Sequence, residues 1–233
     1  MSWKWSKAWR GIAAAAVVCV ALTGCAGGNA STGSSATTGG SASGSTATNG
    51  SSSGSAKSWN APPAMTIKSD KKYEAVFDTT EGKFTVTLFN DVAPKTVNNF
   101  VFLSQQGFYN NVIFHRVIQS FMIQTGDPTG TGRGGPGYNI EDELKTTYKY
   151  EPGIVAMANT GQKNSGGSQF FICTGAECAN LNKQPNYSIF GKVSSGMDVV
   201  DKLAATPVKM DTQGNMSAPT KLIKINKIEI NEK

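Results

Sequence analysis

The sequence predicts a mainly β fold, a closed antiparallel barrel capped by two helices, which follows an N-terminal region without a core of its own. Three observations support this prediction. Short runs of alternating apolar and polar residues recur from Thr66 onward, as β-strands require. Only two stretches show helical spacing, and many strands with two helices in roughly 165 residues favour a closed barrel. Residues 26–58, in contrast, are nearly all Gly, Ser, Thr, Ala and Asn and cannot bury enough apolar surface to fold.

The first 24 residues are predicted to be a signal peptide. Lys4, Lys7 and Arg10 make a positive start, and an apolar run follows over residues 11–23. That run has about thirteen residues, whereas a membrane-spanning helix needs about twenty. We therefore expect cleavage rather than a permanent transmembrane segment.

The end of this run, Leu22-Thr23-Gly24-Cys25, resembles a bacterial lipobox. The resemblance implies that Cys25 becomes the first mature residue and carries lipid with acyl chains such as palmitate. The alternative is an ordinary secretory signal with a chance cysteine. Each buried methylene contributes about 0.8 kcal/mol, so several acyl chains hold a soluble domain on a bilayer. We expect an extracytoplasmic protein that is lipid-anchored to the bacterial cell membrane; which membrane, in a cell with two, stays open.

Residues 25–62 are predicted to form a lipid-anchored flexible linker, and residues 63–233 to form the folded domain. A coil of roughly 35 residues reaches about 30 to 35 Å, which would let the domain move over a membrane surface. Glycosylation of the linker stays open. The net charge of +6 becomes +3 when three basic residues leave with the signal (6 − 3 = 3). Because no polybasic run is present, nucleic acid is not expected as a partner.

The folded part begins with a predicted β-hairpin, in which residues 73–80 and 83–89 form strands around Glu81-Gly82. A helix should follow, because Pro94 suits a first helical turn and Gly107 suits a left-handed stop. Its predicted buried face consists of Val97, Phe100, Val101 and Ser104.

Further strands are predicted over residues 112–118, 121–126, 153–158, 169–174, 188–193 and 221–230, with a short helix near 197–205. In the last strand Ile223 and Ile225 share one face, but Ile228 and Ile230 resume out of phase. A bulge near Asn226 would restore the register.

One cation lies among alternating apolar and amide side chains in the stretch from Phe114 to Asp127. Successive side chains of a strand face opposite sides, so Arg116 should share the face of Phe114 and Ile118. By the same rule Met122 belongs to the face of Gln124. The pattern predicts that the Arg116 guanidinium lies against an apolar surface.

A second block, residues 156–159 followed by residues 166–174, repeats this mixture of aromatic, amide and small side chains. Together the two blocks resemble the cyclophilins, the peptidyl-prolyl cis-trans isomerases, and the resemblance covers roughly residues 66 to 230. It implies an eight-stranded barrel capped by two helices and isomerase activity without a cofactor or metal. It also implies a folding helper, expected to be a monomer, that acts on proline-containing segments of unfolded exported proteins.

The resemblance also implies the roles of individual residues. Arg116 matches the catalytic position, whose cation would stabilise the twisted amide. Phe121, Met122, Phe171 and Leu181 match positions that cradle the proline ring. The remaining substrate-binding positions are Gln124, Ala158, Asn159, Gln169 and Tyr187. His115 precedes the arginine and points the other way by strand alternation, and is expected to be a satisfied core or barrel-edge histidine.

Two positions depart from the family pattern. Many cyclophilins carry a tryptophan before the leucine, where this chain has Asn180, and many carry a histidine where this chain has Tyr187. We expect activity to survive and cyclosporin-type ligands to bind weakly. The placement of Leu181 and Tyr187 depends on a loop whose alignment is open by a residue or two.

Other sequence features are expected to be structural. Cys173 and Cys178 could pair in an oxidising exterior, but a buried thiol at Cys173 is the favoured interpretation. Residues 130–135 match G-x-G-x-x-G, yet Pro136-Gly137 follows instead of an apolar helix, so a flexible loop is expected rather than a dinucleotide site. The acidic run at residues 141–143 is expected to be a solvated turn rather than a cation site.

Two alternatives to the enzyme stay open at this point. The same groove could serve a non-catalytic module that binds proline-containing peptides as a chaperone or assembly partner. The anchor and linker by themselves would also suit a solute-binding lipoprotein, although the globular part is short for two lobes. The client proteins and the residue preferred before proline are not indicated by the sequence.

Overall fold

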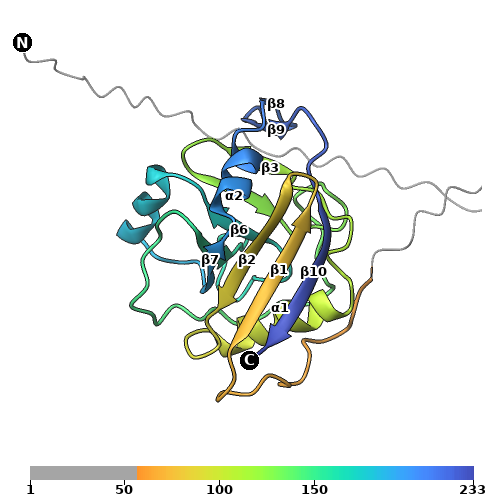
Figure 1. Cartoon of the computed structure of the whole chain (residues 1–233), viewed down its shortest axis with the longest axis vertical. Helices are drawn as coiled ribbons and strands as arrows, with labels where there is room; N and C mark the ends of the chain where they lie inside the picture. The colour runs from red at the N-terminus through yellow and green to blue at the C-terminus, as the bar shows by residue number, and fades with distance from the viewer. Residues whose placement is uncertain (1–56) are drawn as a thin grey trace, which may run out of the picture. The chain divides into compact units, whose positions relative to one another are not determined.

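The computed structural model describes residues 57–233. The predicted signal peptide, the predicted lipid site at Cys25 and most of the predicted linker lie outside the described residues. The elements follow one another as β1 (Tyr73–Thr79), β2 (Gly82–Leu88), α1 (Pro94–Gln105), β3 (Arg116–Ile118), β4 (Met122–Thr125), β5 (Ile154–Met157), β6 (Phe170–Cys173), the 3₁₀ helix η1 (Ala176–Lys183), β7 (Ile189–Ser195), α2 (Met197–Ala204), β8 (Val208–Met210), β9 (Met216–Pro219) and β10 (Ile225–Glu232) (Figure 1). No helix among these residues is long and apolar enough to span a membrane.

Eight strands form one antiparallel sheet in the order β10-β1-β2-β7-β5-β6-β4-β3. The sheet curls around a core, but it does not close, so the predicted closed barrel is wrong. The edge strands β3 and β10 do not pair; the segments that precede them are joined by an isolated bridge between Ile113 and Lys224. The reason is local: the chain is irregular before Arg116, so the strand predicted over 112–118 contributes three residues and cannot form a continuous ladder. For the same reason Phe114 packs inside the core instead of sharing the face of Arg116.

Several predicted elements are confirmed by the backbone. The first hairpin turns at Gly82, with φ of 130°. The helix begins at Pro94 and ends at Gln105, and Gly107, just beyond its cap, has a φ of 64°, the left-handed conformation that glycine adopts without strain. The predicted bulge is present as well, because Asp78 pairs with Lys227 and Thr79 with Ile225, which leaves Asn226 unpaired in the ladder.

The curled sheet separates two apolar clusters. The larger one fills the inside of the sheet, where α1 contributes Val97 and Phe100 and α2 contributes Val200 and Leu203. The smaller one includes Met122, Tyr150, Phe171, Cys173 and Cys178. Strand alternation explains this division. Ile123 and Ile172 belong to the larger cluster, whereas the residues next to them in their strands, Met122, Phe171 and Cys173, belong to the smaller one.

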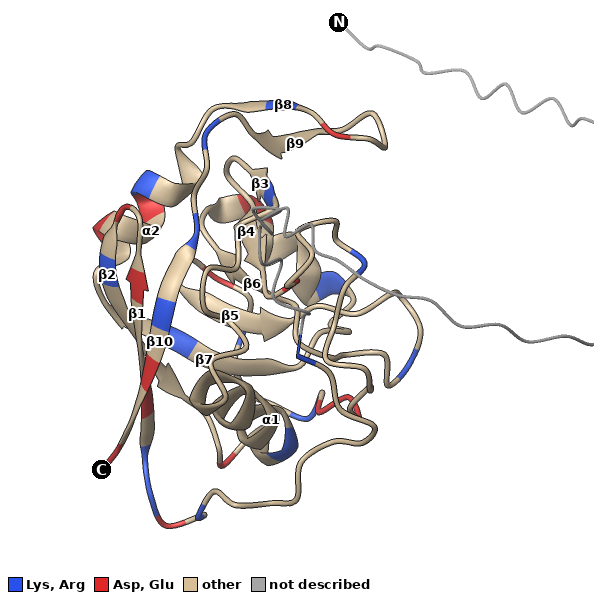
Figure 2. Ribbon diagram, turned by 90° about the vertical axis from the view of Figure 1, so that its right-hand side faces the viewer, with Lys and Arg blue, Asp and Glu red and all other residues tan. Residues whose placement is uncertain are grey.

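The β8–β9 hairpin lies beside β3 and was not predicted (Figures 1 and 2). Asp211 organises its turn: the carboxylate accepts hydrogen bonds from the backbone N–H groups of Gln213 and Asn215, both at 2.8 Å, and from Ser217 Oγ at 2.7 Å. These donors, that of Ser217 first, lower the pKa of Asp211 to about 2. The turn is polar, so the alternation of apolar residues by which strands are predicted does not indicate this hairpin.

The acidic run is more than a solvated turn, because Glu143 caps the N-terminus of α1. Its carboxylate accepts hydrogen bonds from the backbone N–H of Lys95 at 3.0 Å and of Thr96 at 2.8 Å, and from Thr96 Oγ1 at 2.8 Å. Ala93, the residue before the helix, offers no side-chain cap. A carboxylate distant in sequence thus satisfies the exposed N–H groups of the helix.

Trp59 lies within the range predicted as linker and packs on the domain. Its ring centroid is 5.2 Å from that of Phe102 and 5.9 Å from that of Phe108, and its backbone N–H donates to the Pro136 carbonyl at 2.8 Å. Lysines of β2 and β10 lie beside acidic residues of β1 and β10 (Figure 2), and Lys83 Nζ of β2 is 3.6 Å from Asp78 Oδ2 of β1.

Candidate active site

The register of four strands places three of the predicted site residues in one row across the sheet. Arg116 of β3 lies opposite Gln124 of β4, Gln124 lies opposite Phe171 of β6, and Phe171 lies opposite Ala156 of β5. Directly paired residues point to the same face of a sheet. The row therefore sets a cation, an amide and an aromatic ring side by side, as the alternation in the sequence predicts.

Two glutamines hold the arginine in this row. Arg116 Nη1 donates to Gln124 Oε1 at 3.3 Å, and Gln124 Nε2 donates to Gln169 Oε1 at 3.0 Å. Gln169 in turn donates from Nε2 to the Gly134 carbonyl at 2.9 Å. The relay ends on the backbone, so each amide has a fixed orientation. Among residues 57–233, the other N–H groups of the guanidinium have no hydrogen-bond partner, so a ligand in the groove could accept from them.

An apolar wall stands beside the guanidinium. Met122 and Phe171 are buried, with exposed fractions of 1% and 5%, and form its base. Phe121, Leu181 and Tyr187 are partly buried and pack against that base. The Tyr187 ring meets the Phe171 ring edge-on, with centroids 5.3 Å apart and an interplanar angle of 89°. A small apolar ring can lie on this wall within reach of the arginine.

The site opens into a groove of about 890 Å³. Nine of the ten predicted site residues line it: Arg116, Phe121, Met122, Gln124, Ala158, Asn159, Phe171, Leu181 and Tyr187. The tenth, Gln169, lines a second pocket of about 580 Å³ that shares Gln124, Ala158 and Asn159 with the groove. The structure thus brings all ten predicted residues to one region.

The groove also has a wall that the sequence analysis missed. The β8–β9 hairpin contributes Lys209, Met210, Asp211, Thr212, Gln213, Ser217 and Ala218. Met210 is 65% exposed, a high value for a large apolar side chain. The polar turn pattern around Asp211 and Gly214 was the available signal for this hairpin.

Ala158 and Asn159 lie on the opposite rim. The Ala158 N–H donates to the Gln169 carbonyl at 2.9 Å, which continues the β5–β6 pairing beyond the strands. Asn159 Nδ2 donates to the Asn186 carbonyl at 2.8 Å. Asn159 Oδ1 accepts from the Gly161 N–H at 3.0 Å, so the side-chain amide holds the rim itself, and its predicted role in binding a peptide stays a prediction.

His115 is not the satisfied histidine that we expected. Both ring nitrogens are buried, and neither has a hydrogen-bond partner among residues 57–233. The side chain lines the groove near Gly132 instead of facing away from it. Burial lowers the pKa of His115 below its ordinary value of 6.5, with Arg116 acting in the same direction and Asp127 against it.

The glycine-rich loop after β4 is organised by Asp127. This buried carboxylate accepts from the backbone N–H of Thr129 at 2.7 Å and of Arg133 at 3.0 Å. Although burial raises the pKa of Asp127, hydrogen bonds from Thr129 and from the backbone of the glycine-rich loop lower it overall. A side chain at Gly134 would put Cβ against Asp127 Oδ1, so the glycine is needed for close approach. The literal G-x-G-x-x-G match is thus a carboxylate-centred loop.

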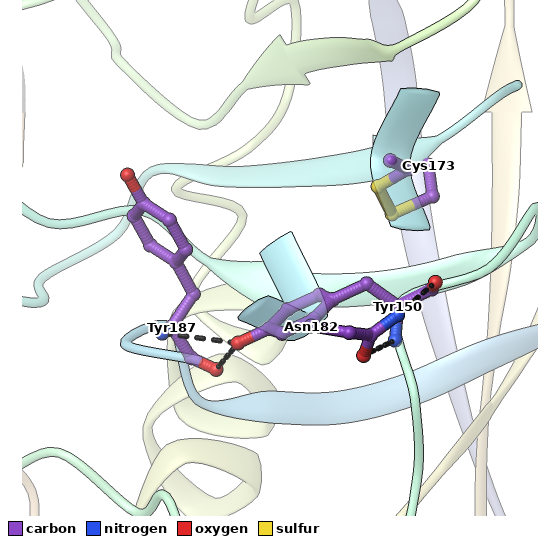
Figure 3. The surroundings of a disulfide bond; sticks show 5 residues. Tyr150, Cys173, Asn182 and Tyr187 are labelled. Carbon is purple, nitrogen blue, oxygen red and sulfur yellow. Dashed lines mark hydrogen bonds between the residues drawn. A yellow bond between two sulfur atoms is a disulfide. The ribbon is translucent and has the colours of Figure 1, made fainter. Parts of the chain in front are cut away.

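Cys173 and Cys178 form a disulfide, with Cα atoms 5.7 Å apart, so the favoured buried thiol at Cys173 is wrong (Figure 3). The sequence did not reveal the reason. The 3₁₀ helix η1 turns the chain back on itself, and Cys178, its one buried residue, faces the end of β6.

Comparisons with known proteins agree with this geometry. The family described as cyclophilin type peptidyl-prolyl cis-trans isomerase/CLD matches residues 75–230. Peptidyl-prolyl cis-trans isomerase-like 1 of Aspergillus fumigatus is 47% identical over 160 residues, which cover 67% of this chain and 96% of that relative. Peptidyl-prolyl cis-trans isomerase CYP18-2 of Arabidopsis thaliana is 40% identical over 159 residues, which cover 65% of this chain and 86% of that protein.

Solved structures give the same likeness. The crystal structure of a cyclophilin type peptidyl-prolyl cis-trans isomerase of Cryptosporidium parvum superposes with a TM-score of 0.62 and 36% identity, covering 69% of this chain and 98% of that one. A second crystal structure of that protein, in the presence of the dipeptide Ala-Pro, superposes with a TM-score of 0.60.

Proposed function

The chain belongs to the cyclophilin-type peptidyl-prolyl cis-trans isomerases, and from this membership we propose that Arg116 drives X-Pro rotation by stabilising the twisted amide. Isomerase activity follows from the family itself.

The chemistry requires a donor that acts in the transition state alone. Rotation about a peptide bond faces a barrier of about 18 to 20 kcal/mol, because the nitrogen lone pair is shared with the carbonyl. In the twisted state the lone pair returns to the prolyl nitrogen, which then accepts a hydrogen bond that the planar amide cannot accept. A fixed donor aimed at this nitrogen therefore lowers the barrier without tightening ground-state binding.

The single observation that carries the proposal is the Arg116–Gln124–Gln169 relay beside the apolar wall. The wall of Met122 and Phe171 would receive the proline ring, and the guanidinium would then lie next to the prolyl nitrogen. The presence of Ala-Pro with the Cryptosporidium relative supports an X-Pro unit as the ligand of this groove.

The test is cis-to-trans exchange of an X-Pro peptide, followed by NMR exchange with soluble protein that begins at Lys57. The parent should accelerate exchange, and Arg116→Ala should lose about a hundredfold, as loss of a positioned donor requires. Arg116→Lys keeps the charge without the rigid fork and should fall between the two. A folded parent that binds the peptide without accelerating exchange would favour a binding module.

We also propose that the protein is lipid-anchored through Cys25 and helps exported proteins to fold outside the cytoplasm, as a monomer. The lipobox-like sequence and the Gly/Ser/Thr/Ala linker support the anchor. The Cys173–Cys178 disulfide supports an oxidising location, because such bonds are rare in reducing cytosol. Exported chains would supply unfolded X-Pro segments, whose slow isomerisation limits folding.

Fractionation of cells that express the full chain tests the anchor. The parent should sediment with membranes and carry a radiolabelled acyl chain, whereas Cys25→Ser should be released or remain uncleaved. A Cys25→Ser protein that is still cleaved, acylated and membrane-bound would contradict the proposal. The Cys19→Ser variant is the matched control, since this cysteine lies within the predicted signal.

A further inference from the structure

The segment from Thr174 to Tyr187 carries one side of the proline wall, yet it has little internal support. Its centre is the eight-residue 3₁₀ helix η1, which has no side-chain cap and buries only Cys178. Helices of this type rarely exceed three or four residues, because their hydrogen bonds have poor geometry. Leu181 on η1 and Tyr187 after it nevertheless line the groove, so their positions depend on contacts from outside the segment.

The first such contact is the disulfide. It joins Cys173, the last residue of β6, to the buried residue of η1. Two backbone hydrogen bonds strengthen this joint: Thr174 N–H donates to the Phe121 carbonyl, and Glu177 N–H to the Ser120 carbonyl, both at 3.0 Å. The start of η1 is thereby fixed to the segment just before β4, which carries Phe121.

The second contact is Tyr150, which is 2% exposed and holds the segment at two places (Figure 3). Its backbone N–H donates to Asn182 Oδ1 at 2.9 Å, and its carbonyl accepts from Asn182 Nδ2 at 3.0 Å. Its hydroxyl donates to the Tyr187 carbonyl at 2.6 Å and accepts from the Tyr187 N–H at 3.1 Å. Tyr150 therefore ties the end of η1 to the groove-lining Tyr187.

From these contacts we infer that Tyr150 and the Cys173–Cys178 disulfide are positioning groups that fix Leu181 and Tyr187 as one wall of the proline site. Neither group lines the groove itself. The inference rests on the proposed function for its ligand, an X-Pro peptide. Loss of either group should weaken peptide binding and leave Arg116 and its relay untouched.

Tyr150→Phe tests the first group, because it removes the hydroxyl and keeps the buried ring. One lost buried hydrogen-bonding group corresponds to about a three- to tenfold rise in KM and in the dissociation constant of an X-Pro peptide, with kcat within about twofold. The Leu181 methyl signals in ¹³C NMR should also shift. Tyr73→Phe is the matched control: this tyrosine is 3% exposed, its hydroxyl accepts from the Lys68 N–H at 2.9 Å, and it lies away from the groove.

A double variant, Cys173→Ala with Cys178→Ala, tests the second group, and its effect on KM should have the same direction. Circular dichroism before each titration checks that the variant is folded. A folded Tyr150→Phe whose peptide affinity, KM and Leu181 signals match those of Tyr73→Phe would overturn the inference. If the parent does not accelerate exchange but Tyr150→Phe still binds the peptide more weakly, the proposed function fails and the positioning role stands.

Discussion

Gln124→Leu is the perturbation that tests most closely how the arginine is held. Gln124 accepts from Arg116 at 3.3 Å and donates to Gln169 at 3.0 Å, so the change breaks both bonds of the relay and preserves much of the side-chain volume. The guanidinium would remain charged and near the groove. Its orientation toward the prolyl nitrogen would no longer be fixed.

The structure sets the expected magnitude. Hydrogen bonds to charged groups contribute about 1.5 to 3 kcal/mol, and a 3.3 Å separation is longer than the usual 2.7 to 3.2 Å, so a value near the lower limit applies. Since each 1.36 kcal/mol corresponds to about tenfold in rate, kcat/KM should fall about five- to twentyfold. Complete loss of the donor in Arg116→Ala sets the upper limit of about a hundredfold.

The assay is exchange of an X-Pro peptide, with Gln169→Leu as the graded comparison. Gln169→Leu leaves the Arg116–Gln124 bond in place and removes only its support, so its loss should be smaller than that of Gln124→Leu. Unfolding curves check that the three proteins are comparably folded. A folded Gln124→Leu with kcat/KM within about twofold of the parent would refute the idea that the relay orients the arginine.

Three further predictions concern stability. Burial lowers the pKa of His115 below 6.5, so the unfolded chain binds a proton at this side chain more readily than the folded protein. The contribution of His115 to the free energy of unfolding is therefore fully present above about pH 6.5 and is lost as the pH falls through the folded pKa. His115→Gln, which removes the only histidine of the chain, should flatten the free energy of unfolding over this range in urea titrations. Glu143→Ala should cost about 1 to 2 kcal/mol by loss of the α1 cap, Glu143→Gln should cost less, and equal costs would contradict a charge-assisted cap. Trp59→Ala should cost about 2 kcal/mol in thermal unfolding through its lost packing on Phe102 and Phe108, and an unchanged midpoint would show that this contact does not contribute.

The parts of the site that the sequence could predict are those carried by strand alternation and by the family resemblance. For Arg116 and Gln124 a period of two indicates the face of each strand, and the family resemblance added Phe171. The register between β3, β4 and β6, which brings the three side chains to one face, comes from the structure. The bulge at Asn226 was predictable for the same reason, because the isoleucines around it change phase.

The missed features depend on contacts between distant segments. The barrel stays open because residues before Arg116 leave the strand conformation, and no local pattern shows this. The cap of α1 comes from Glu143, and the disulfide depends on how η1 turns, so neither can be seen in a single segment. The Asp211 hairpin is polar throughout its turn, which removes the apolar signal on which strand prediction relies.

The most direct test of the mechanism compares binding with catalysis in Arg116→Ala. The dissociation constant of an X-Pro peptide and kcat are measured on the same folded protein, by NMR titration and exchange. If the arginine acts on the twisted amide alone, kcat should fall about a hundredfold while the dissociation constant changes by less than about threefold. A dissociation constant that rises as much as kcat/KM falls, with kcat preserved, would show that Arg116 binds the substrate and does not stabilise the transition state.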